Sequence, residues 1–85
     1  MKFPFTLLFL LLFSLTVSSQ TYRELSEKAI DYIEEDSLAQ AEDFLVQAMK
    51  LEPSNPHNAL LFSNLGLVQR RLGRYDDALQ SYTYA

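Results

Sequence analysis

Hydrophobic positions in the C-terminal third of the chain recur at helical spacing and form two stripes. The first stripe contains four positions that share one helical face: Phe62, Leu65, Gly66 and Gln69. The second follows Gly73 at steps of three, four and three residues: Tyr75, Ala78, Tyr82 and Ala85. Gly73 can adopt the left-handed conformation that ends a helix. Because Gly66 and Ala78 are small, the pattern predicts an antiparallel helical hairpin with closely packed helices.

A similar pattern occupies the middle of the chain. Thr21 and Glu24 have capping-box spacing, which predicts a helix start. The stripe that follows contains Leu25, Ala29 and Tyr32, widened by Ile30 and Ile33. Asp36 and Ser37 interrupt it and are suited to cap a next helix, with Glu42 and Asp43 expected in its first turn. The stripe of that helix contains Leu38, Ala41, Leu45 and Ala48, and Pro53 ends it.

The two patterns are related by a constant shift of 37 residues, the difference between Leu25 and Phe62. The same shift relates the paired positions Ala29 and Gly66, Leu38 and Tyr75, Ala41 and Ala78, Leu45 and Tyr82, and Ala48 and Ala85. Pro53 and Pro56 prevent a continuous helix between the two patterns, so a loop is expected there. The sequence therefore predicts two copies of one helical hairpin.

This pattern resembles the tetratricopeptide repeat, whose unit is about 34 residues. The positions that carry the resemblance are Phe62, Leu65, Gly66, Gly73, Tyr75, Ala78, Tyr82 and Ala85. Gln69 departs from it, since the family usually has an aromatic residue there, and the first copy departs at Lys28, Asp36 and Leu45. The resemblance implies an all-α fold of stacked antiparallel hairpins, one in residues 20–55 and a second, truncated at its C-terminal end, in residues 56–85.

The first 19 residues have a different character. Lys2 precedes an almost wholly apolar run from Phe3 to Val17, and small residues follow. This pattern predicts a signal peptide cleaved between Ser19 and Gln20. The run is shorter than the roughly 18 or more apolar residues of a membrane span. An uncleaved N-terminal membrane anchor is the alternative.

Charge and composition exclude several classes of function. The formal net charge is −4, and removal of Lys2 with the signal peptide makes it −5. A nucleic-acid-binding surface would need a basic stripe, so no nucleic-acid partner is expected. The chain has no cysteine, which excludes disulfides and thiol chemistry.

No arrangement of residues predicts catalysis, a cofactor or a metal site. His57 is the only histidine, and as a general base or metal ligand it lacks partners at suitable spacing. It is expected to be an exposed loop or first-turn residue. Asp31 and Glu35 lie four residues apart in an acidic run. Two interpretations are open, a weak cation site and a solvated acidic face, and the solvated face is preferred.

Three arginines near Gly73 allow two interpretations. Arg70, Arg71 and Arg74 can bind an acidic peptide or carboxylate through bidentate pairs. The preferred interpretation is structural, because positive charge stabilises the last turn of a helix and Asp76 and Asp77 are close in sequence. Tyr75 and Tyr82 are expected to pack in the core.

The resemblance also implies a groove, because the first helix of each hairpin lines the concave face of such repeats. The groove candidates are Arg23, Ser26, Ile30 and Ile33 from one copy and Ser63, Leu67 and Arg70 from the other. Ile30 and Leu67 lie at inward positions where capture of a terminal carboxylate would need polar groups. A partly apolar groove instead favours an extended or helical peptide.

These observations predict an exported, non-enzymatic scaffold that binds a protein or peptide partner. The alternative is a sensor or adaptor region at the N-terminus of a longer signalling or enzymatic protein, with its active domain beyond residue 85. Solenoids need about three repeats for stability. The chain is therefore expected to be a piece of a longer protein or to require a partner, through further repeats or self-association.

Overall fold

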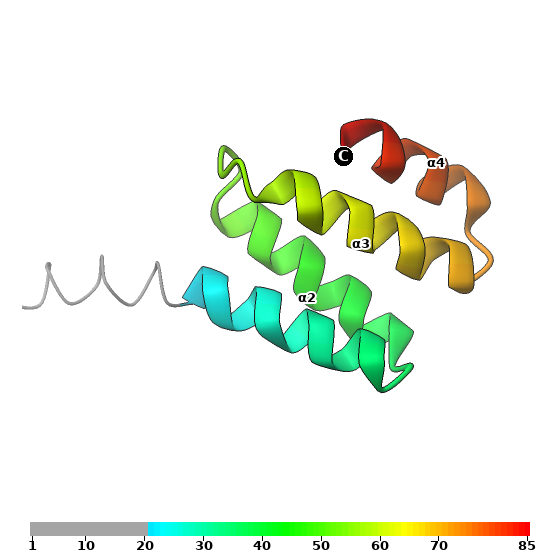
Figure 1. Ribbon diagram of the computed structural model, residues 1–85, viewed down its shortest axis with the longest axis horizontal. Helices are drawn as coiled ribbons and strands as arrows, with labels where there is room; N and C mark the ends of the chain where they lie inside the picture. Colours follow the sequence, from blue (N-terminus) through cyan, green and yellow to red (C-terminus); the bar gives the residue numbers. More distant parts are fainter. Residues whose placement is uncertain (1–20) are drawn as a thin grey trace, which may run out of the picture.

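The protein folds as two antiparallel helical hairpins in the computed structural model, which describes residues 21–85 (Figure 1). The first hairpin pairs a helix over residues 21–34 with α2 (Leu38–Leu51). The second pairs α3 (Asn58–Arg71) with α4 (Tyr75–Tyr84). The predicted all-α fold of stacked hairpins is confirmed. The predicted signal peptide, residues 1–19, lies outside the described residues.

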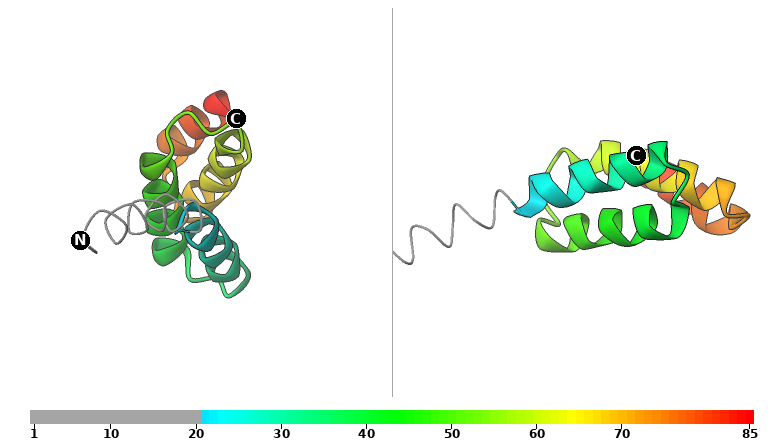
Figure 2. Two further views of the ribbon diagram at one scale, coloured as in Figure 1. Left: turned by 90° about the vertical axis from the view of Figure 1, so that its left-hand side faces the viewer. Right: turned by 90° about the horizontal axis from the view of Figure 1, so that it is seen from below.

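The hairpins stack in chain order, with α3 packed between α2 and α4 (Figure 1). In the left view of Figure 2 the first helix and α3 lie on one side, and α2 and α4 lie on the other. Within residues 21–85, every helix is too short or too polar to cross a membrane. The arrangement places the first helices of the two hairpins next to each other.

The core joins the two hairpins through α2 and α3. Leu45, Leu61 and Val68 are the largest side chains that are completely buried. Each contributes about 1.5–3 kcal/mol by leaving water. Ala29 in the first helix and Ala41 in α2 are also fully buried, which allows close helix packing. The stacked rings of Tyr32 and Phe44, with centroids 5.4 Å apart, join the helices of the first hairpin.

The two hairpin turns are copies of one structure. Asp36 and Gly73, which are 37 residues apart, both have positive φ, at 59° and 82°. The amide of Ser37 donates to the carbonyl of Tyr32, and the amide of Arg74 donates to that of Gln69 in the equivalent bond, both at 2.8 Å. These bonds satisfy helix-end carbonyls and reverse the chain. Asp36 therefore has a left-handed backbone conformation that glycine adopts more easily.

The capping predictions are corrected in detail. Thr21 is the first described residue of the first helix and is already helical. Ser37 precedes α2 but makes no capping hydrogen bond with its side chain. The first turn of α2 contains no acidic residue, because the helix begins at Leu38 and Glu42 and Asp43 lie further along.

The second hairpin is less buried than its spacing predicts. Ala78 is buried, but Tyr75 is 69% exposed and Tyr82 is 39% exposed. Ala85 is exposed and follows the end of α4. The reason is that α4 packs on α3, and its other face is not covered by any of the described helices. Tyr82 still packs with one ring edge against Gly66.

Candidate functional site

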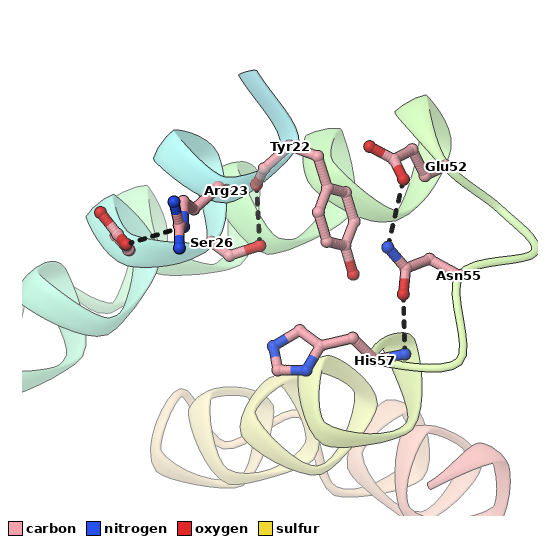
Figure 3. A pocket seen from close by; sticks show the side chains of 7 residues that line it. Tyr22, Arg23, Ser26, Glu52, Asn55 and His57 are labelled. Atoms are coloured by element: carbon pink, nitrogen blue, oxygen red, sulfur yellow. Dashed lines mark hydrogen bonds and ion pairs between the residues drawn. The ribbon is translucent and has the colours of Figure 1, made fainter. Parts of the chain in front are cut away.

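A cavity of about 470 Å³ lies between the start of the first helix and the loop that joins the two hairpins (Figure 3). We call it the polar bowl. Seven residues line it: Tyr22, Arg23, Ser26, Glu27, Glu52, Asn55 and His57. The first helix and the hairpin-connecting loop provide all of them. The bowl is thus formed where the two hairpins meet.

A smaller cavity of about 120 Å³ adjoins the bowl, and we call it the apolar cavity. Seven residues line it: Ser26, Glu27, Ile30, His57, Leu60, Leu61 and Asn64. Three of them, Ser26, Glu27 and His57, also line the bowl. The two cavities therefore form one groove between the first helix and α3. Ile30 and Leu60 stay 37% and 53% exposed in it, although both are aliphatic.

The wall of the bowl is fixed by hydrogen bonds across the hairpin junction. The buried Tyr22 hydroxyl donates to Asn58 Oδ1 at 2.6 Å, and Asn58 Nδ2 donates to the Glu52 carbonyl at 2.7 Å. Asn55 Nδ2 donates to the Glu52 carboxylate at 3.1 Å, and the His57 amide donates to Asn55 Oδ1 at 2.8 Å. This network connects the first helix, the loop and the start of α3. A ligand would meet a wall that is already ordered.

Burial raises the pKa of the Tyr22 phenol, and the nearby Glu52 carboxylate raises it further. Both effects disfavour the phenolate, because it would lie out of water and beside a negative charge. The His57 ring packs against Tyr22 edge-on, with ring centroids 6.4 Å apart. Tyr22 is therefore a neutral donor that holds the loop.

Three of the seven predicted groove residues line the observed groove: Arg23, Ser26 and Ile30. Ile33 instead packs partly buried against the core. Ser63, Leu67 and Arg70 do not line either cavity. Ser63 is the repeat equivalent of Ser26. Because Ser26 lies on the side of the first helix that faces the following hairpin, Ser63 lies on the corresponding side of α3, which is turned away from the first helix.

Sequence reasoning missed the α3 side of the groove. His57, Leu60 and Asn64 line it at steps of three and four residues. The spacing places these three residues on one face of α3, but it does not show which face of α3 lies against the first helix. Tyr22 was also missed, because its partner Asn58 lies 36 residues away.

A second polar network is centred on Gln69, at a position where the tetratricopeptide pattern usually has an aromatic residue. Gln69 is buried, accepts a hydrogen bond from Ser81 at 2.6 Å and donates to Glu42 at 3.3 Å. Arg74 donates to both oxygens of the Glu42 carboxylate, at 2.6 and 2.8 Å. These bonds connect α2, α3 and α4. Arg74 thus pairs with Glu42 on a distant helix.

The remaining sequence candidates lie in ordinary structural positions. Arg70 and Arg71 occupy the last turn of α3, where positive charge is favourable. Asp31 and Glu35 are exposed. Over residues 21–85, no group of three or more His, Cys, Asp or Glu side chains is placed to hold a metal ion.

One face of α4 is apolar and exposed. Tyr75, Leu79 and Tyr82 lie at steps of four and three residues, and Leu79 is 68% exposed. We call these three residues the α4 outer face. Their repeat equivalents in α2 are Leu38, Glu42 and Leu45, and Leu45 is completely buried.

No protein-family model matches the chain, and no curated protein matches it. Among solved structures, the chain is similar to a tetratricopeptide repeat protein from Parabacteroides merdae ATCC 43184. The two share 48% sequence identity with a TM-score of 0.74, and the match covers 75% of this chain. The matched part of the chain covers 25% of the other protein, about a quarter of its length. This similarity supports the tetratricopeptide repeat family.

Proposed function

We propose that this chain is a tetratricopeptide repeat scaffold whose groove between the first helix and α3 binds a peptide segment of a partner protein. The observation that carries the proposal is the exposed aliphatic surface of Ile30 and Leu60 within a groove whose wall is held by hydrogen bonds. Covering apolar surface contributes about 25 cal/mol per Å². An ordered wall reduces the entropy lost on binding.

The test uses the full chain and a partner captured from the exported fraction. Ile30→Ala and Leu60→Ala each remove exposed aliphatic surface from the groove and should weaken partner binding several-fold. Arg70→Ala is the matched control, because Arg70 is exposed but lies outside both cavities. Unchanged affinity in both groove variants would contradict the proposal.

We also propose that residues 1–19 direct export and are removed between Ser19 and Gln20. The short apolar run after Lys2 and the small residues that follow it support this. Mass spectrometry of the exported protein should find Gln20 at the N-terminus. An intact Met1 would indicate the membrane-anchored alternative.

A second candidate is an adaptor role within a longer protein, for which the α4 outer face provides the specific observation. The α2 equivalent of Leu79 is Glu42, which hydrogen-bonds to Gln69 and Arg74 of the next hairpin, so the same face on α4 is suited to receive a further hairpin. In a longer chain that includes downstream repeats, the amides of α4 should be protected from hydrogen exchange, and Leu79→Asp should remove this protection. Equal protection in the longer chain and its Leu79→Asp variant would exclude this use of the face.

A further inference from the structure

The groove combines two chemically different cavities side by side. The polar bowl has about four times the volume of the apolar cavity. Ser26, Glu27 and His57 lie at the boundary between them. A ligand that fills both can therefore place a side chain with a polar end in the larger cavity and a small apolar group in the smaller one.

The uncompensated charge in the bowl is negative. One oxygen of the Glu52 carboxylate accepts a hydrogen bond from Asn55, and no cation of residues 21–85 forms an ion pair with this carboxylate. Glu27 faces Arg23 at 3.7 Å, with both side chains at least 70% exposed. Such an exposed pair contributes about 0.2–1 kcal/mol, so a ligand cation can compete for Glu27.

The surroundings extend this negative potential along the first helix. Asp31 and Glu34 follow Glu27 at steps of four and three residues, and both are exposed. The N-terminus of α3 does not offer free donors for an anion. The amides of Asn58, Ala59 and Leu60 already donate to carbonyls of the preceding loop, at 2.9, 3.3 and 3.0 Å.

We propose that the groove selects a cationic peptide, in which a Lys or Arg side chain lies in the polar bowl between Glu27 and Glu52 and an adjacent small aliphatic side chain fills the apolar cavity beside Ile30 and Leu60. This inference rests on the proposed peptide-binding function and names its ligand class. Charge sets the orientation of the peptide, and burial of the aliphatic group supplies much of the affinity.

The test is fluorescence anisotropy of the full chain with three labelled synthetic peptides of equal length. They share one Gly/Ser sequence and differ in a central pair, which is Lys-Val, Glu-Val or Lys-Ser. The Lys-Val peptide should bind most tightly, and added salt should weaken its binding. Glu52→Gln and Glu27→Gln should each reduce its affinity roughly threefold to fivefold. Glu35→Gln, next to the other end of the same helix, is the matched control and should have little effect.

The outcomes separate this inference from the function on which it rests. Equal or tighter binding of the Glu-Val peptide would overturn the cationic preference, while the groove would remain a peptide site. Equal binding of Lys-Val and Lys-Ser would overturn the role of the apolar cavity. If none of the three peptides binds, while circular dichroism shows the chain folded, both the inference and the peptide-binding function are overturned.

Discussion

The contact between Gly66 and Tyr82 explains why α3 has a glycine in its interior. A Cβ atom added at Gly66 would lie 2.7 Å from two ring carbons of Tyr82 and 3.0 Å from a third. Non-bonded carbon atoms prefer separations of about 3.5–4.0 Å. The variant Gly66→Ala therefore requires the Tyr82 ring to move.

Two opposing effects set the magnitude. Alanine is more favourable than glycine in a helix interior by about 0.8–1.0 kcal/mol. Overpacking typically costs about 1–3 kcal/mol, so Gly66→Ala should destabilise the protein by up to about 2 kcal/mol. In a Tyr82→Ala background the ring is absent, and the same substitution should stabilise by about 0.8–1.0 kcal/mol. The effect of one methyl group thus changes sign with the residue at position 82.

Urea denaturation followed by circular dichroism on the four proteins of this cycle measures the coupling. We expect about 1–3 kcal/mol between the two positions. Tyr84→Ala is the matched control, because Tyr84 is on the same helix but packs against Phe62, with ring centroids 5.2 Å apart. Its coupling to Gly66→Ala should be close to zero. If Gly66→Ala stabilises the parent protein, the packing of Tyr82 against α3 is refuted.

Three further predictions concern the turns and the buried polar groups. A Cβ atom added at Gly73 would meet open space, but the φ of 82° is unfavourable for alanine, so Gly73→Ala should destabilise the protein by about 1–2 kcal/mol. Asp36→Gly should instead stabilise it by up to about 1 kcal/mol, because glycine adopts positive φ without strain. If thermal melts show that both substitutions change the stability in the same direction, the shared turn structure is contradicted. Because the pKa of Tyr22 is raised above 10.0, the neutral phenol stabilises the fold at lower pH and this contribution is lost as pH rises through the folded pKa. Tyr22→Phe should therefore be less stable at neutral pH but lose less stability in alkaline urea titrations, and parallel pH profiles would contradict this. Ser81→Ala removes the hydroxyl that donates to the buried Gln69 side chain at 2.6 Å, and it should lower the free energy of unfolding by about 1–3 kcal/mol in urea denaturation. An unchanged free energy of unfolding would contradict this.

The sequence predicts the hairpins well because their determinants are local. Helical spacing identifies the buried positions Ala41, Leu45 and Ala48, and the left-handed turn at Gly73 follows from the freedom of glycine. The constant shift of 37 residues also aligns Asp36 with Gly73 and so indicates the less obvious turn at Asp36. Each of these features depends on neighbours within one or two helical turns.

The groove was predicted less well because it depends on contacts between hairpins. Helical spacing does not determine which side of α3 faces the first helix, so Ser63 was expected in place of Leu60. The bond between Tyr22 and Asn58 and the pair between Glu42 and Arg74 join distant positions. Tyr75 was expected in the core, but its burial depends on a helix packed against α4 rather than on its spacing.

The most direct test of the account is a titration of the labelled full chain with the Lys-Val peptide, followed residue by residue by nuclear magnetic resonance. The account predicts that the largest amide and side-chain shifts occur at Arg23, Ile30, Leu60 and Asn64, on the two sides of the groove. Shifts centred on Tyr75 and Leu79, with the groove unchanged, would contradict it.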